Sequence, residues 1–219
     1  MDFSVIDWED ILQASFDTLT MTGVSLLLTI LLGLPLGVLL FLTSKKQLLE
    51  QRGIYALLSF LVNLLRSVPF IILLIVLIPL TLFLVGTSLG VAGTIPPLVI
   101  GTTPFFARLV ENVLRDVDKG IIEACQAMGA KTHQIILQAL LPEALPGLLA
   151  AATVTTIALV SYSAMSGVIG GGGLGDLALR FGYQRFQTEV MIVTVAILVI
   201  LVQLIQWLGD VLVARFTRK

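Results

Sequence analysis

The residues whose types could support catalysis are few in this sequence, and their spacing excludes most active sites. The single histidine, His133, has no histidine, cysteine or carboxylate at metal-ligand spacing around it, so we expect a solvated helix residue. The glycine run at residues 170–175 formally matches G-x-G-x-x-G, but it follows an apolar segment instead of a strand, so we expect a flexible loop. The phosphate-binding pattern G-x-x-x-x-G-K-[ST] does not occur, so the chain itself is not expected to hydrolyse a nucleotide.

One polar stretch, residues 116–142, has the spacing of a binding surface. Asp118 is the expected N-cap of a helix, and Glu123 lies in an early turn, where the helix dipole favours an acid. Gly129 is expected to end this helix in a left-handed conformation, and Thr132 to cap the next helix. The first helix is thin enough to enter a groove on another protein. Its small residues, with one adaptable apolar anchor, are Ala124, Cys125, Ala127, Ala130 and Met128.

The composition shows which kind of structure must hold these residues. Hydrophobic residues make up 57% of the 219 residues and charged residues only 12%, and the mean hydropathy is +1.04. These values are typical of an integral membrane protein. The length allows one membrane domain, residues 1–219, without a large soluble appendage. The single cysteine, Cys125, cannot form an intramolecular disulfide and is expected to be a small packing residue.

Five segments are long and apolar enough to cross a bilayer as helices. They are residues 19–42, 68–84, 89–107, 144–168 and 190–213. Residues 54–65 are also apolar, but Asn63 and Arg66 interrupt this region, which we interpret as a helix at the interface or an extension of the second span. No segment alternates as a barrel strand does, so the sequence predicts an all-α membrane protein with five transmembrane helices and one cytoplasmic helical loop.

Basic residues orient the predicted bundle, because cytoplasmic loops carry the excess of lysine and arginine. They follow the first, third and fifth spans: Lys45, Lys46, Arg52; Arg108, Arg115, Lys119, Lys131; Arg215, Arg218, Lys219. The first 17 residues carry acids, beginning with Asp2, and no basic residue, so the first helix is not a cleaved signal peptide. We therefore expect an N-terminus outside, a C-terminus in the cytoplasm, and residues 116–142 in the cytoplasm.

Charged residues are absent from the middle of the predicted spans. Arg66, Arg108, Glu111 and Asp210 all fall toward the predicted cytoplasmic ends, so no proton or sodium site is evident. Arg66 is interpreted either as an interface anchor or as part of a translocation path.

Met165 lies in a run of small residues of the fourth span and suggests a pore gate or a dimer contact. Ser161 and Ser163 flank the same position. The alternatives of gate and dimer contact remain open at this point.

The loop of residues 116–142 resembles the cytoplasmic signature of ABC importer permeases. That signature reads E-A-A, three residues, Gly, nine residues, Ile, one residue, Leu-Pro, and here its positions hold Glu123, Ala124, Gly129, Leu141 and Pro142. Cys125 replaces the third residue, and Ala139 replaces the isoleucine; both replacements are small and apolar. Without this spacing, an amphipathic loop resting on the membrane would be the simpler interpretation.

The resemblance extends to the permease subunits of methionine importers over nearly the whole chain. It is carried by "LRSVPFIILL" (65–74), "ARLVENVL" (107–114), "LLPEALPGLL" (140–149) and "YSAMSGVIGGGGLGDLALRFGYQRF" (162–186). The resemblance implies a homodimer in a bacterial inner membrane, two cytoplasmic ATPase subunits that hold ATP and Mg, and an extracytoplasmic substrate-binding protein. It implies no cofactor in this subunit, contact with membrane lipid and no nucleic acid.

Two other functions remain to be distinguished from methionine import. Within the same class, the chain is a permease for another polar amino acid. From a different class, it is a stand-alone channel or an ion-coupled carrier, which the patterned loop and the missing mid-membrane charges disfavour. The sequence does not identify the substrate, because such importers largely delegate selection to the binding protein.

Overall fold

The computed structural model describes residues 7–217, and every regular element in that range is a helix. The charged residues Asp2, Arg218 and Lys219 lie outside the described range. The predicted all-α class is confirmed. Helices satisfy their own backbone hydrogen bonds, which lipid cannot do for them.

Four helices are long and apolar enough to cross a membrane unaided. They are α1 (Trp8–Thr43), α5 (Gly90–Arg115), α8 (Leu141–Met165, continuous with the turns on either side) and α10 (Thr188–Phe216). The predicted spans 19–42, 89–107, 144–168 and 190–213 coincide with these helices and are confirmed.

The predicted second span, residues 68–84, is wrong as a single helix. This segment forms two short helices, α3 (Phe70–Val76) and α4 (Ile78–Val85), and the longer helix before it is α2 (Arg52–Ser67). Pro69 explains the break, because the residue before a proline avoids the helical conformation, and Val68 has a ψ of 125°. The chain bends by 100° between α2 and α3, and with this pair as one broken span the bundle has five.

Because α2 is a long helix that ends just before Pro69, Arg66 does not lie at the end of the bundle where we expected it. Because α2 begins at Arg52, beside the loop after α1, Arg66 lies about 21 Å further along the helix. Its guanidinium stands over the ring of Phe105 in α5, with Cζ 5.9 Å from the ring centroid. The expectation that Arg66 lies near a cytoplasmic end is therefore wrong.

The first and third spans, α1 and α5, pack most closely in the bundle. A Cβ at Gly37 would lie 2.6 Å from the carbonyl oxygen of Ala107, so only glycine permits this approach. Further along the same contact, the buried hydroxyls of Thr29 and Thr102 form a hydrogen bond of 2.7 Å. Close packing and a buried hydroxyl pair hold the two helices without a charge.

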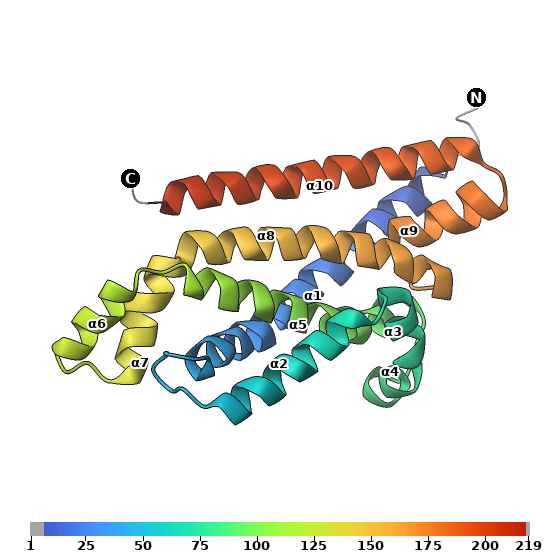
Figure 1. Ribbon diagram of the computed structural model, residues 1–219. Coiled ribbons are helices and arrows are strands. Elements are labelled where there is room, and N and C mark those ends of the chain that lie inside the picture. The colour runs from blue at the N-terminus through green and yellow to red at the C-terminus, as the bar shows by residue number, and fades with distance from the viewer. Residues whose placement is uncertain (1–6, 218–219) are drawn as a thin grey trace.

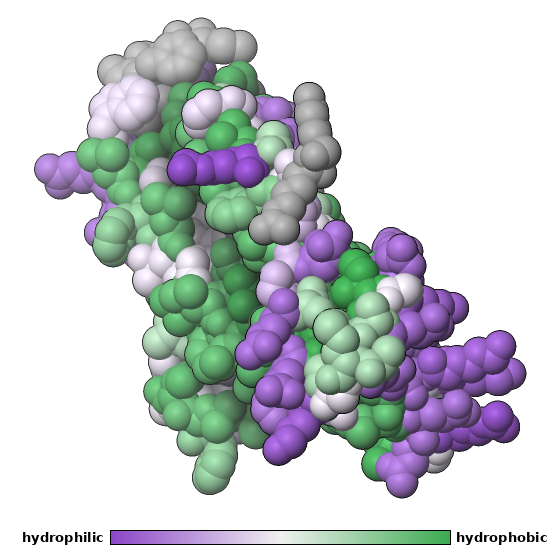
Figure 2. All heavy atoms as spheres, turned by 90° about the vertical axis from the view of Figure 1, so that its left-hand side faces the viewer, coloured by the Kyte–Doolittle hydropathy of each residue, from purple (hydrophilic) through white to green (hydrophobic). Residues whose placement is uncertain are grey.

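The connecting segments gather at two opposite ends of the bundle (Figure 1). One end carries the turn between α1 and α2, the end of α10, and the loop with α6 (Lys119–Ala127) and α7 (Thr132–Gln134). The other carries the beginning of α1, α3, α4 and α9 (Gly173–Leu177). Figure 2 looks onto the end with α6 and shows the largest group of hydrophilic side chains on one part of that face, with a few more among the hydrophobic ones elsewhere.

The glycine-rich run at residues 170–175 is folded and not a flexible loop, contrary to the sequence prediction. Gly170, Gly172 and Gly173 have φ values of +76° to +79°, which glycine adopts without a Cβ penalty. The chain then enters α9, where the buried N–H of Leu174 donates to Thr18 Oγ1 of α1 at 2.9 Å. The run therefore fastens the segment after α8 onto the first span.

Candidate functional site

The helix α6 has the beginning and the end that the sequence predicts. Asp118 Oδ1 accepts from the N–H of Gly120 at 2.8 Å, which makes Asp118 the N-cap. Gly129 has a φ of +77°. The N–H groups of Gly129 and Ala130 donate to the carbonyls of Gln126 and Cys125 at 2.9 and 3.0 Å, which is the Schellman pattern of helix termination.

The start of the second helix differs from the prediction. Thr132 is the first helical residue and not the cap. The backbone N–H of Lys131, the residue before it, donates to Gln134 Oε1 at 2.8 Å. Gln134 performs this capping because its longer side chain reaches back from the third helical position.

The two faces of α6 have different environments. Glu123, Ala124 and Ala127 are exposed, and Met128 just after the helix is 78% exposed. Cys125 and Ala130 are half-buried and pack against the bundle, which agrees with the expectation that Cys125 is a small packing residue but removes both from the docking surface predicted for the small residues. The exposed motif residues of α6 and its terminating turn are therefore an acid, two alanines, Met128 and Gly129.

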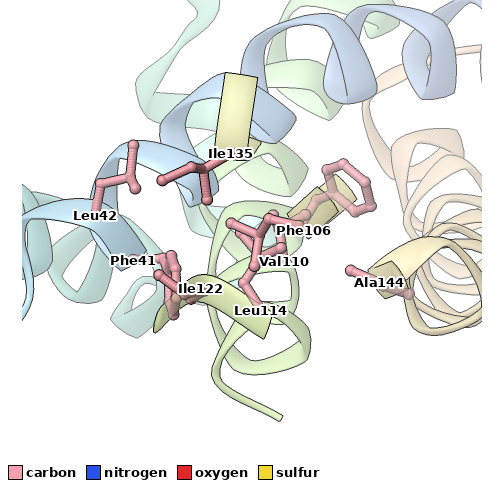
Figure 3. Close-up of a cluster of buried hydrophobic side chains, with 10 residues drawn as sticks. Phe41, Leu42, Phe106, Val110, Leu114, Ile122, Ile135 and Ala144 are labelled. Carbon is pink, nitrogen blue, oxygen red and sulfur yellow. The ribbon is translucent and has the colours of Figure 1, made fainter. Parts of the chain in front are cut away.

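A buried apolar cluster joins this loop to three spans (Figure 3). Ile122 is the only buried residue of α6, and it packs with Ile135 of the turn η2 (Ile135–Leu140). The cluster also includes Phe41 from α1, Leu114 from α5 and Ala144 from α8. Because packed interiors transmit displacement instead of absorbing it, a movement of α6 must be shared by the ends of these spans that lie beside it.

The last two residues of the sequence motif, Leu141 and Pro142, have different environments. Leu141 is half-buried and packs against the cluster, whereas Pro142 is exposed and lines a pocket of about 630 Å³ between α6, α8 and the end of α10. The motif therefore combines residues that hold the loop with residues that remain accessible.

A buried carboxylate, Glu111 of α5, was missed in the sequence analysis as a structural centre. It is 1% exposed and forms salt bridges with Arg108 and Arg115 on the same helix. The hydroxyl of Tyr55 in α2 donates to Glu111 Oε1 at 3.2 Å. One carboxylate thus compensates two cations, as a buried charge requires.

The same network extends along α2. Nη2 of Arg108 donates to Ser59 Oγ at 2.8 Å and to Asn63 Oδ1 at 3.0 Å. The only sequence signal for it is the spacing of Arg108, Glu111 and Arg115, which places them on one helical face. The partners on α2 are distant in sequence, so the spacing alone does not reveal what the charges hold together.

The three gate candidates do not lie on one surface. Ser163 is buried, and its hydroxyl donates to the carbonyl of Val160 at 2.8 Å. Ser161 and Met165 are exposed on another face of α8, four residues apart, and Met165 is 46% exposed. The structure therefore brings Ser161 and Met165 together at the protomer surface and separates them from Ser163.

The described residues 7–217 contain no group of three or more histidine, cysteine, aspartate or glutamate side chains that could hold a metal ion. Four continuous spans and one broken span, with an exposed helical loop between the third and the fourth, have the form expected of the membrane subunit of an importer. Residues 30–218 match the family described as binding-protein-dependent transport system inner membrane component, and the chain belongs to this family. It is the permease subunit of an ABC importer and a multi-pass inner-membrane protein.

Similar curated proteins cover almost the whole chain. The probable D-methionine transport system permease protein MetI of Vibrio cholerae is 49% identical over 95% of this chain and 93% of its own length. The methionine import system permease protein MetP of Bacillus subtilis is 47% identical over 96% of this chain and 95% of its own length.

Among solved structures, a chain of the inward facing MetNI methionine ABC transporter matches with a TM-score of 0.95 and 47% identity, with both chains fully covered. A chain of an amino acid ABC transporter solved with histidines matches with a TM-score of 0.80 and 21% identity over 98% of this chain and 99% of its own. The second similarity concerns the fold alone.

Proposed function

We propose that this permease moves methionine into the cytoplasm by alternating access, as one half of a homodimer. The observation that carries the proposal is the similarity to methionine permeases over nearly the full length, at 47–49% identity. The transporter whose chain matches with a TM-score of 0.95 is itself a methionine transporter. Two ATPase subunits bind ATP with Mg and hydrolyse it, and an extracytoplasmic binding protein delivers the substrate.

The loop of residues 116–142 is the surface through which the ATPase drives transport. Its exposed strip around Glu123, Ala124, Ala127 and Met128 fits a groove on the partner, because small side chains allow close approach and methionine adapts to an irregular surface. The cluster under Ile122 links that strip to three spans. The ATPase must bind the inward and outward states with different affinity, since equal affinity would shift nothing.

Uptake into proteoliposomes tests this function. Liposomes that contain the permease with its cognate ATPase, supplied with the binding protein outside, are expected to accumulate radiolabelled methionine only when ATP is inside. Liposomes without ATP provide the control. Uptake of a different amino acid in place of methionine would establish the alternative permease, and uptake driven by an ion gradient without ATP would establish a carrier.

The proposed orientation predicts which residues an impermeant thiol reagent reaches. Thr188 is exposed at the start of α10, on the end of the bundle opposite α6. In intact cells, a Thr188→Cys protein is expected to be labelled from outside, whereas native Cys125 stays protected until the membrane is permeabilised. The reverse pattern would contradict both the orientation and the docking of an ATPase at α6.

Met165 is proposed as an apolar gate near the dimer axis, with Ser161 beside it. Shortening the side chain removes the flexible contact that seals the closed state. Met165→Ala is therefore expected to raise basal ATP hydrolysis or substrate leakage severalfold without loss of assembly. Val168→Ala is the matched control, because Val168 is also an exposed apolar residue just beyond the end of α8. Loss of dimers in Met165→Ala would show a packing residue instead.

A further inference from the structure

A small pocket lies where four helices meet, apart from the loop of residues 116–142 and from the gate candidates Ser161, Ser163 and Met165. Its volume is about 130 Å³, far more than one water molecule needs. The lining side chains that matter here come from α2, α3, α5 and α8: Arg66, Phe70, Leu73, Gly101, Phe105 and Tyr162.

The pocket lies between the two ends of the bundle, nearer the end that carries α6. Phe105, below the guanidinium of Arg66, is about 22 Å along α5 from Gly90 and about 15 Å from Arg115. An arginine at this depth is costly in contact with lipid, and such residues mark substrate or ion pathways. An anchor at the membrane interface does not explain an arginine at this position, so Arg66 needs another role.

Arg66 also differs from the other arginines of α2 and α5. Arg52 pairs with Glu50, while Arg108 and Arg115 share Glu111. Within the described part of the chain, Arg66 has no carboxylate partner, and its only interaction is the contact with the ring of Phe105. A planar guanidinium without an acid partner is a ready donor for a carboxylate, which it binds through two parallel hydrogen bonds.

An aromatic pair also lines the pocket. The rings of Phe70 and Tyr162 are stacked, with centroids 4.4 Å apart and an angle of 9° between the planes. Among residues 7–217, the hydroxyl of Tyr162 makes no hydrogen bond, so it can donate to a molecule in the pocket. Gly101 keeps the wall open, since a Cβ there would lie 3.3 Å from the side chains of Phe70 and Leu73.

We propose that this pocket is a substrate subsite of the permease for an α-amino acid with an apolar side chain. Arg66 binds the carboxylate, and the Phe70–Tyr162 stack contacts the side chain. A thioether suits this surface, because sulfur makes favourable contacts with aromatic rings at about 5 Å. The proposal rests on the proposed methionine transport, to which it adds a site within the membrane subunit itself.

Photolabelling of the assembled permease–ATPase complex tests the subsite. The probe is a diazirine analogue of methionine that keeps the amino and carboxylate groups, used without the binding protein. Adducts are expected on peptides that contain Phe70, Phe105 or Tyr162. Excess methionine should compete, and methioninol, which lacks the carboxylate, should not. Arg66→Gln is expected to reduce the labelling about tenfold, since a charged hydrogen-bonding partner is lost, and Arg66→Lys should retain part of it.

Arg185→Gln is the matched control, because Arg185 also stands over a phenyl ring, that of Phe181, but lies outside the pocket. Its labelling should equal that of the wild type. Absence of specific adducts in these peptides, equal labelling of Arg66→Gln, or equal competition by methioninol would overturn the subsite. Wild-type proteoliposomes are assayed for uptake in parallel: if they transport no methionine, the proposed function fails independently of the labelling result.

Discussion

Gly129→Val is expected to lower ATP-driven uptake at least about tenfold while the helical bundle remains folded. The reason is backbone strain: Gly129 has a φ of +77°, and a β-branched residue in that conformation costs roughly 1–2 kcal/mol. Unwinding the Schellman turn relieves the strain. The exposed strip of α6 would then lose its fixed direction, although the membrane spans are untouched. The measurement compares uptake with ATP hydrolysis in the purified complex.

Gly86→Val separates this effect from general destabilisation. Gly86 ends α4 with a φ of +75°, and a Cβ at either Gly86 or Gly129 would meet no atom within 4 Å. The two variants therefore carry the same backbone strain at opposite ends of the bundle. Only the variant at Gly129 should separate hydrolysis from transport. Normal uptake by Gly129→Val, or equal loss in both variants, would contradict the role of the loop in coupling.

Glu111→Gln is expected to destabilise the bundle strongly. The amide keeps the shape of the side chain but leaves Arg108 and Arg115 without their carboxylate. Breaking a buried ion pair by removing one partner costs about 3–5 kcal/mol. In a chain of this size that corresponds to a decrease of roughly 6–20 °C in melting temperature. Thermal unfolding of the detergent-purified complex measures it.

The exposed pair of Glu50 and Arg52 provides the control. The pKa of Glu50 is lowered, chiefly by the backbone N–H of Lys46, which donates to it at 2.9 Å, and then by Arg52. Both side chains are open to solvent, so Glu50→Gln should hardly change the melting temperature. If Glu111→Gln and Glu50→Gln melt at the same temperature, the network around Glu111 does not hold α2 to α5.

The sequence was sufficient for four spans because each contains enough apolar residues to be recognised without tertiary information. The prediction of the second span as one helix was wrong for a local reason. Apolar residues continue through Pro69 and Pro79, so hydropathy favours 68–84, whereas the prolines place helix boundaries inside that segment. The sequence did not identify α2 as part of a span, because Asn63 and Arg66 lower its hydropathy. The residues that contact these two side chains, Arg108 and Phe105, lie on α5.

The loop of residues 116–142 was predictable where conformation is determined locally. Asp118 and Gly129 have their expected roles because caps and left-handed turns depend on neighbouring residues only. Cys125 packs inward as expected of a small packing residue, but the inward position of Ala130 was not predictable, since it depends on which side of the turn meets the buried cluster. The pocket at Arg66 is likewise the product of four helices, and no stretch of sequence contains it.

The polar contacts of α2 have a consequence for how the protein is made. An arginine in a membrane helix opposes insertion by the translocon, by about 2.5–3.5 kcal/mol where it lies at the helix centre, and α2 is long and apolar enough to span a bilayer only together with α3. Asn63 and Ser59 find their partner in Arg108 of α5, which the ribosome synthesises later. We therefore expect the nascent α2 to wait beside the translocon and to enter the bilayer stably only when α5 emerges.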